Sequence, residues 1–148
     1  MKKHILLLFA VIMTAMSGYA FDKYSINRED LPEAAQQFLT TYFPKAKVGM
    51  IKTDKHLLKK TDYDVRLVNG TTIEFSNSGK WTSVDCKGRE VPKDIIPRSI
   101  RNYVNKNFQD VNIVKIKKTS SKYEVTLSDD VTLIFNLLGQ FRSVKMDD

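Results

Sequence analysis

The same pattern of apolar residues occurs twice along this chain, over about residues 24–87 and again over about 90–147. The clearest match is "TTIEFSNSGKWTSVD" at 71–85 with "VTLIFNLLGQFRSVK" at 131–145. Five extra residues within "TDKHLLKKTD" at 53–62 change the spacing of the matches from 65 to 60, which predicts a loop there. A repeat of this period indicates a tandem duplication that buries one shared core. Matched positions include Leu31 and Ile96, Phe38 and Tyr103, Ile51 and Ile116, Tyr63 and Tyr123, Phe75 and Phe135, and Trp81 and Phe141.

The first 20 residues have the features of a cleaved secretory signal. Lys2 and Lys3 precede the apolar stretch "ILLLFAVIMTAM", and Gly18-Tyr19-Ala20 places small residues at a cleavage site. In a bacterium this predicts a periplasmic or secreted protein. No later segment is apolar enough to span a membrane. The mature chain then divides into two predicted units, residues 21–89 and 90–148.

The mature chain is only mildly basic. The full sequence has 24 Lys plus Arg and 17 Asp plus Glu, and the loss of Lys2 and Lys3 leaves a net charge of +5. The basic residues alternate with carboxylates and do not form one stripe with stacking aromatics. Nucleic acid is therefore not an expected partner.

Cys86 is the single cysteine, so the chain cannot form an intramolecular disulfide. We interpret Cys86 as a small buried side chain; an intermolecular disulfide or a reactive thiol is the alternative. His56 is the single histidine after the signal segment, which leaves little for Cys/His or Ser/His/Asp catalysis. We expect no enzyme activity and no cofactor.

Each unit begins with a helix pattern and continues with strand patterns. An apolar stripe after Pro32 ends at Pro44, and a matching stripe follows Pro97. The period then changes to two, and Asn69-Gly70 supplies a favoured hairpin turn. The predicted fold class is α+β, with tandem helix-plus-four-strand antiparallel repeats and the helices on one face of the sheet.

The order helix, strand, strand, Asn-Gly turn, "IEF", "SNSGKW", "SV" resembles the secreted PepSY-like family, whose duplicated members are similar to the β-lactamase inhibitory protein. The resemblance covers nearly all of the mature chain. It implies a tandem α-β4 arrangement, which can join into one eight-stranded curved sheet, and a binding or inhibitory role without catalysis. Members often carry Asp where this chain has Ser76 and Asn136, and the inhibitory protein is braced by disulfides that this chain cannot form. The resemblance therefore assigns no inhibitory residue here.

The sheet face that the helices leave open is the predicted binding surface. If Val65 and Ile73 point toward the helix, alternation directs their neighbours the other way. The charged side chains predicted on the open face are Asp64, Arg66, Glu74 and Glu124.

Trp81 and Phe141 occupy matching positions, and two placements are open for them. If Val84 and Val144 face inward, strict alternation places both rings on the open face, where aromatics beside charges suit a protein interface. Alternatively, a β-bulge turns Trp81 back over the edge of the core.

Other charged clusters are weaker candidates. The carboxylate pairs at Asp62 and Asp64, Asp129 and Asp130, and Asp147 and Asp148 suit turns and chain ends better than a Ca²⁺ site. The lysines of 52–60 and 115–122 suit a solvated surface, and the alternative is attraction of an acidic partner or a glycan.

Two functions remain. The first is a protein-binding module, inhibitor-like in character, that docks its open sheet face on another extracytoplasmic protein. The alternative is a carrier of a small ligand or an envelope polymer, which needs a shaped cavity of several hundred Å³.

Overall fold

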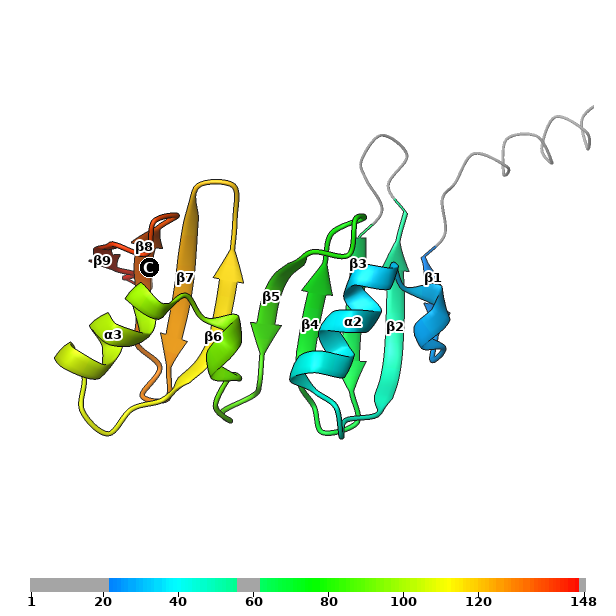
Figure 1. Cartoon of the computed structure of the whole chain (residues 1–148), viewed down its shortest axis with the longest axis horizontal. Coiled ribbons are helices and arrows are strands. Elements are labelled where there is room, and N and C mark those ends of the chain that lie inside the picture. The colour runs from blue at the N-terminus through cyan, green and yellow to red at the C-terminus, as the bar shows by residue number, and fades with distance from the viewer. Residues whose placement is uncertain (1–21, 56–61, 147–148) are drawn as a thin grey trace, which may run out of the picture.

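In the part of the chain that the structure describes, nine strands join in chain order into one antiparallel sheet. The computed structural model describes residues 22–55 and 62–146, so the predicted signal segment 1–20 and positions 56–61 of the predicted loop lie outside the described residues. β1 and β9 form the two edges at opposite ends of the sheet (Figure 1). The strands are β1 (Lys23–Ser25), β2 (Val48–Asp54), β3 (Asp62–Leu67), β4 (Thr72–Phe75), β5 (Trp81–Asp85), β6 (Ile113–Lys118), β7 (Lys122–Leu127), β8 (Thr132–Asn136) and β9 (Phe141–Val144).

Two α-helices pack against this sheet in the described part of the chain. They are α2 (Glu33–Tyr42) and α3 (Arg98–Asn107), and short 3-10 turns precede them at η1 (Arg28–Asp30) and η2 (Lys93–Ile95). Each helix follows directly after a proline, a residue whose fixed φ favours the start of a helix. In Figure 1, α2 lies over β2 to β4 and α3 lies near β7 and β8. Neither helix has the length and apolar character that a membrane crossing requires.

The predicted fold class, α+β with tandem helix-plus-four-strand repeats, is wrong. The described residues are mainly sheet, and the two α-helices among them have ten residues each. β5 and β6 pair directly, with Val84 opposite Ile116, so the strands continue without interruption. In two separate four-stranded units, β5 and β6 would be edge strands with unpaired N–H and C=O groups. The pairing of β5 with β6 provides hydrogen-bond partners for these groups. β1 is a ninth strand that alternation did not predict.

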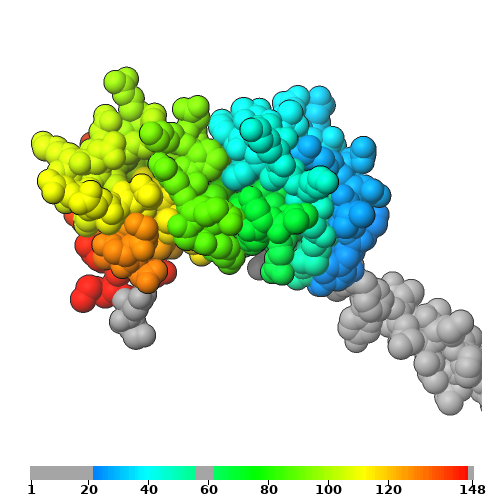
Figure 2. Space-filling model, turned by 90° about the horizontal axis from the view of Figure 1, so that it is seen from below, coloured from blue at the N-terminus to red at the C-terminus, as the bar shows by residue number. Residues whose placement is uncertain are grey.

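The boundary predicted between residues 89 and 90 falls between β5 and η2 and stays a prediction. Figure 2 shows one elongated body, in which the green residues join the blue and cyan end to the yellow and red end.

One row of apolar side chains crosses the sheet and forms the base of the core. Residues directly opposite each other on neighbouring strands point to the same face. The buried row therefore lies on a single face, which we call the covered face, and both α-helices contribute buried residues to the same cluster. The row consists of Ile51, Val65, Ile73, Val84, Ile116, Val125 and Leu133.

Cys86 follows β5 and belongs to this core, where it is 2% exposed. Burial raises the pKa of its thiol. The interpretation of Cys86 as a small buried side chain is confirmed.

The turn between β4 and β5 touches the start of α2. Gly79 lies in this turn with a φ of +82°, a conformation that favours glycine. A β-carbon at Gly79 would lie 2.9 Å from the backbone nitrogen of Ala35 and 3.1 Å from Cβ of Ala34. The absence of a side chain at Gly79 therefore lets the turn hold the helix against the sheet.

Candidate functional site

The second face of the sheet is lined by polar and charged side chains, and we call it the uncovered face. Its residues alternate along each strand with the buried row, so they point away from α2 and α3. The uncovered face includes Tyr24, Met50, Lys52, Asp54, Asp62, Asp64, Arg66, Thr72, Glu74, Ser83, Asp85, Lys115, Lys117, Lys122, Glu124, Thr126, Thr132, Ile134, Asn136 and Ser143.

Carboxylates gather on β2 to β4 of this face. Asp64 lies directly opposite Glu74, and Lys52 lies opposite Asp64 on the other side. Burial, the charge of Glu74 and the charge of Asp54 together raise the pKa of Asp64 to about 6. Lys52 Nζ lies 3.0 Å from Asp54 Oδ1, and this hydrogen bond lowers the pKa of Asp54 and raises that of Lys52. Like charges opposite each other repel, so this part of the face favours a cation or a basic partner.

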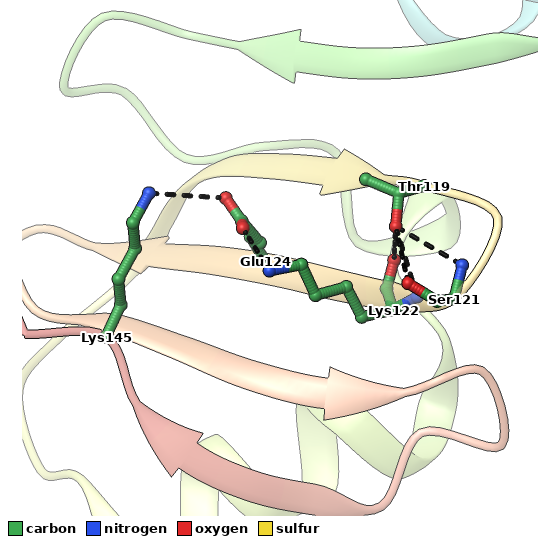
Figure 3. A network of polar contacts seen from close by, with 5 residues as sticks. All are labelled: Thr119, Ser121, Lys122, Glu124 and Lys145. Carbon is green, nitrogen blue, oxygen red and sulfur yellow. Dashed lines mark hydrogen bonds and ion pairs between the residues drawn. The ribbon is translucent and has the colours of Figure 1, made fainter.

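Lysines gather at the other end of the same face. Glu124 on β7 is held between Lys122 Nζ at 2.9 Å and Lys145 Nζ at 3.7 Å (Figure 3). The hydrogen bond from Lys122 and the charges of Lys122 and Lys145 lower the pKa of Glu124, against a smaller opposing effect of burial. Lys115 and Lys117 on β6 extend this positive region toward the middle of the sheet.

The uncovered face therefore has a bipolar charge distribution: it is negative on β2 to β4 and positive on β6 to β9. On β2 to β4 the carboxylates outnumber the cations by four to two, namely Asp54, Asp62, Asp64 and Glu74 against Lys52 and Arg66. On β6 to β9 the lysines outnumber the single carboxylate, Glu124. The two regions meet where Asp85 of β5 lies opposite Lys115 of β6. Burial would raise the pKa of Asp85, but hydrogen bonds from Lys87 and the nearby cations outweigh it and lower this pKa. Such a surface complements a partner with the opposite arrangement of charge.

Four of the predicted site residues lie on this face. Asp64, Arg66 and Glu74 occupy the adjacent strands β3 and β4, with Arg66 and Glu74 exposed. Glu124 lies further along the sheet, on β7. The structure thus places the first three together and the fourth in the positive region.

Trp81 and Phe141 do not lie on the uncovered face. The register shifts between Glu74 and Phe75, so Trp81 pairs with Phe75 and the extra residue on β5 is Thr82. The same shift between β8 and β9 places Phe141 opposite Phe135. A β-bulge inserts one residue and reverses the alternation beyond it. The outward placement expected from strict alternation is therefore wrong, and the bulge alternative is what the structure shows.

Both rings extend the aromatic part of the core. Phe141 stacks on Tyr103 of α3 with ring centroids 4.7 Å apart, and it meets the edge of Phe135 at 5.9 Å. Trp81 is half-buried and packs against the core cluster.

The remaining candidates form no constellation in the described residues. No group of three or more His, Cys, Asp or Glu residues there has an arrangement that could hold a metal ion. His56, Lys59, Lys60, Asp147 and Asp148 lie outside the described residues.

Surface cavities lie beside the helices, and sequence reasoning missed them. One of about 540 Å³ lies between the C-terminal end of α2 and the turn at Asn69. A second, of about 400 Å³, lies beside α3 and is lined by Arg98, Arg101 and Asn105. The spacing of three and four residues between Arg98, Arg101 and Asn105 places their side chains on one face of α3, which the sequence does show. The cavity itself also needs Val111 and Asn112 beside that face, which the sequence does not show.

Comparisons with known proteins agree with this architecture. Residues 61–143, more than half of the chain, match the family described as "Putative beta-lactamase-inhibitor-like, PepSY-like". No curated protein matches the chain.

Solved structures from Bacteroides are similar to it. A "putative periplasmic protein of unknown function" from Bacteroides vulgatus is 33% identical with a TM-score of 0.81, over 85% of this chain and 100% of that one. A "putative calcium-regulated periplasmic protein" from Bacteroides thetaiotaomicron is 36% identical with a TM-score of 0.79, over 84% of this chain and 97% of that one. A third, from the DUF2874 family of Bacteroides vulgatus, is 35% identical with a TM-score of 0.80, over 87% of this chain and 100% of that one. All three are described as periplasmic, in agreement with the location expected from residues 1–20.

Proposed function

Because the chain belongs to the PepSY-like, beta-lactamase-inhibitor-like family, we propose that it is a non-enzymatic protein that docks on another extracytoplasmic protein through the uncovered face of its sheet. The resemblance noted in the sequence is confirmed by this membership, whereas the docking role is our proposal.

The bipolar charge of the uncovered face carries this proposal. The acidic region around Asp64 and Glu74 and the basic region around Lys115 and Lys117 lie on one continuous surface. A folded partner with a basic patch beside an acidic patch matches both regions in one orientation. Complementary charge of this kind accelerates association and fixes the register of the complex, and salt weakens it.

The interior supports a docking module over a carrier. The core between the α-helices and the sheet is filled by one cluster of buried side chains. The cavities described above open at the surface beside the helices. A carrier of a small ligand or an envelope polymer that used the space between helix and sheet would need a shaped pocket there, where the buried cluster lies instead.

If the partner is an enzyme, docking blocks access to part of its surface, which fits the inhibitor-like description of the family. No residue of this chain is assigned to enter an active site.

Affinity capture from the native envelope fraction tests the proposal. The bait is the mature chain, compared with the double variant Asp64→Lys/Glu74→Lys, which reverses the acidic region. The matched control is Glu29→Lys/Glu33→Lys, which also reverses two carboxylates, at exposed positions of η1 and α2. We expect a protein that the parent and the control retain and the sheet-face variant loses. Equal capture by all three baits, or loss with the control alone, would contradict the proposal.

A further inference from the structure

The cavity beside α3 is polar and lies away from the uncovered face. Its volume is about 400 Å³, within the range of small-molecule sites. α3 belongs to the covered side of the sheet, because Ile100 and Val104 are part of the core. The residues lining the cavity are Glu90, Lys93, Ile96, Arg98, Arg101, Asn102, Val104, Asn105, Val111, Asn112 and Ile113.

Positive charge dominates this lining. Lys93, Arg98 and Arg101 face one carboxylate, that of Glu90, and none of these four forms an ion pair with another described residue. α3 also begins at the cavity, with Arg98 as its first residue, no acidic residue in its first turn and no side-chain cap. The N-terminal end of a helix carries partial positive charge, so cations there are unfavourable unless an anion is close.

Arg101 contains a buried hydrogen-bond donor that is left without an acceptor. Its Nε atom is buried and has no partner in the part of the chain that the structure describes. A buried donor without an acceptor costs free energy. Arg101 as a whole is only partly buried and lines the cavity, so the terminal NH2 groups of its guanidinium, and not the buried Nε, are the donors that an oxyanion in the cavity can meet.

The rest of the lining suits a small organic anion. The side-chain amides of Asn102, Asn105 and Asn112 offer both donors and acceptors. Ile96, Val104 and Ile113 provide an apolar wall for a short hydrocarbon part.

We propose that this cavity is a binding site for a small oxyanion, a carboxylate or a phosphate group, held by Arg98 and Arg101 with Lys93 nearby. Arg fits these groups because its planar fork donates two parallel hydrogen bonds. The site is independent of the docking surface, so either can fail without the other.

NMR titration of the mature chain tests the site with two probes, inorganic phosphate and sodium hexanoate. Sodium chloride at equal ionic strength is the blank. We expect saturable shifts at the amides of Arg101, Asn105 and Asn112 with at least one probe. Tighter binding of phosphate would identify a phosphorylated ligand, and tighter binding of hexanoate an organic acid. Shifts that match the chloride blank for both probes would overturn the proposal.

Variants separate the site from nonspecific charge. Arg101→Gln is expected to weaken binding about tenfold, the loss of a charge-assisted hydrogen bond. Arg28→Gln is the matched control, because Arg28 Nε is also buried without a partner but Arg28 does not line the cavity. If Arg101→Gln fails to fold, Arg98→Gln, an exposed change, must show the weakening instead. Unchanged binding in the folded cavity variant, or equal weakening by Arg28→Gln, would also overturn the proposal.

Discussion

Trp81 lies directly opposite Phe75 across β4 and β5, on the covered face of the sheet. Phe75 in turn meets Phe38 of α2 edge to face, with ring centroids 5.4 Å apart. Trp81 therefore extends the aromatic contacts between α2 and the sheet, and its role in stability follows from this position.

Replacing Trp81 with Ala is expected to destabilise the fold by about 2 kcal/mol, less than for a fully buried Trp because the side chain is only partly buried. Urea unfolding followed by circular dichroism measures this, since Trp81 is the single tryptophan and its fluorescence is lost. Glu74→Ala, on the opposite face, should change stability by no more than about 0.5 kcal/mol. An unchanged midpoint for Trp81→Ala would show that the ring contributes nothing to the core.

Gly79→Ala is expected to cost more stability than Gly70→Ala. Both glycines have positive φ, +82° and +95°, so both variants pay for a strained backbone. A β-carbon at Gly79 also meets the start of α2, whereas nothing lies within 4 Å of one at Gly70. We expect the costs to differ by about 1–2 kcal/mol in urea unfolding. Equal costs would mean that the turn does not press against the helix.

Asp64 should make the protein less stable as the pH rises from about 4 to about 6. Its pKa is about 6 in the folded protein and near 3.8 when unfolded, so the unfolded chain releases the proton first. Ionisation of Asp64 therefore lowers the free energy of unfolding by its full amount above pH 6 and leaves it unchanged below pH 4. The shift would be worth about 3 kcal/mol without screening, and partial exposure reduces this to about 1 kcal/mol.

Asp64→Asn should consequently be more stable than the parent at pH 7.5 and equal to it at pH 4. Asp62→Asn, at an exposed position of the same strand, is the control and should show no such dependence. A gain for Asp64→Asn of the same size at both pH values would exclude this carboxyl as the cause.

Cys86 should react slowly with thiol reagents in the folded protein. Burial removes access and raises the pKa of the thiol, and both effects lower the concentration of reactive thiolate. We expect a modification rate about a hundredfold below that in 6 M urea. Equal rates in native buffer and in urea would place the thiol at the surface.

The sequence predicted the faces of the strands better than their assembly. Alternation identified Val65 and Ile73 as buried and Asp64 and Glu74 as their outward neighbours, because one dry face fixes the register of a strand. Alternation did not predict the pairing of β5 with β6, since that contact depends on backbone groups and not on side-chain pattern, and only the family resemblance allowed for a continuous sheet. It also missed β1, whose three residues are too few to show alternation.

The position of Trp81 shows why the sequence predicted only some of the site residues on the correct face of the sheet. A single extra residue at Thr82 reverses the alternation, and no local signal in "KWTSVD" distinguishes the bulge from a regular strand. The cavity beside α3 was missed because it needs Val111 and Asn112 to lie against the helix, which is a tertiary contact.

Site-specific photo-crosslinking in living cells tests the docking role of the uncovered face most directly. A photoreactive phenylalanine analogue placed at Arg66 or Glu74 samples this face, and the same group at Gln37 or Lys106 samples exposed positions on α2 and α3. We predict a discrete adduct of one partner from Arg66 and Glu74 that is missing from both helix positions. Adducts from Gln37 or Lys106 alone, or no adduct from either sheet position in a folded and exported protein, would contradict docking through this face.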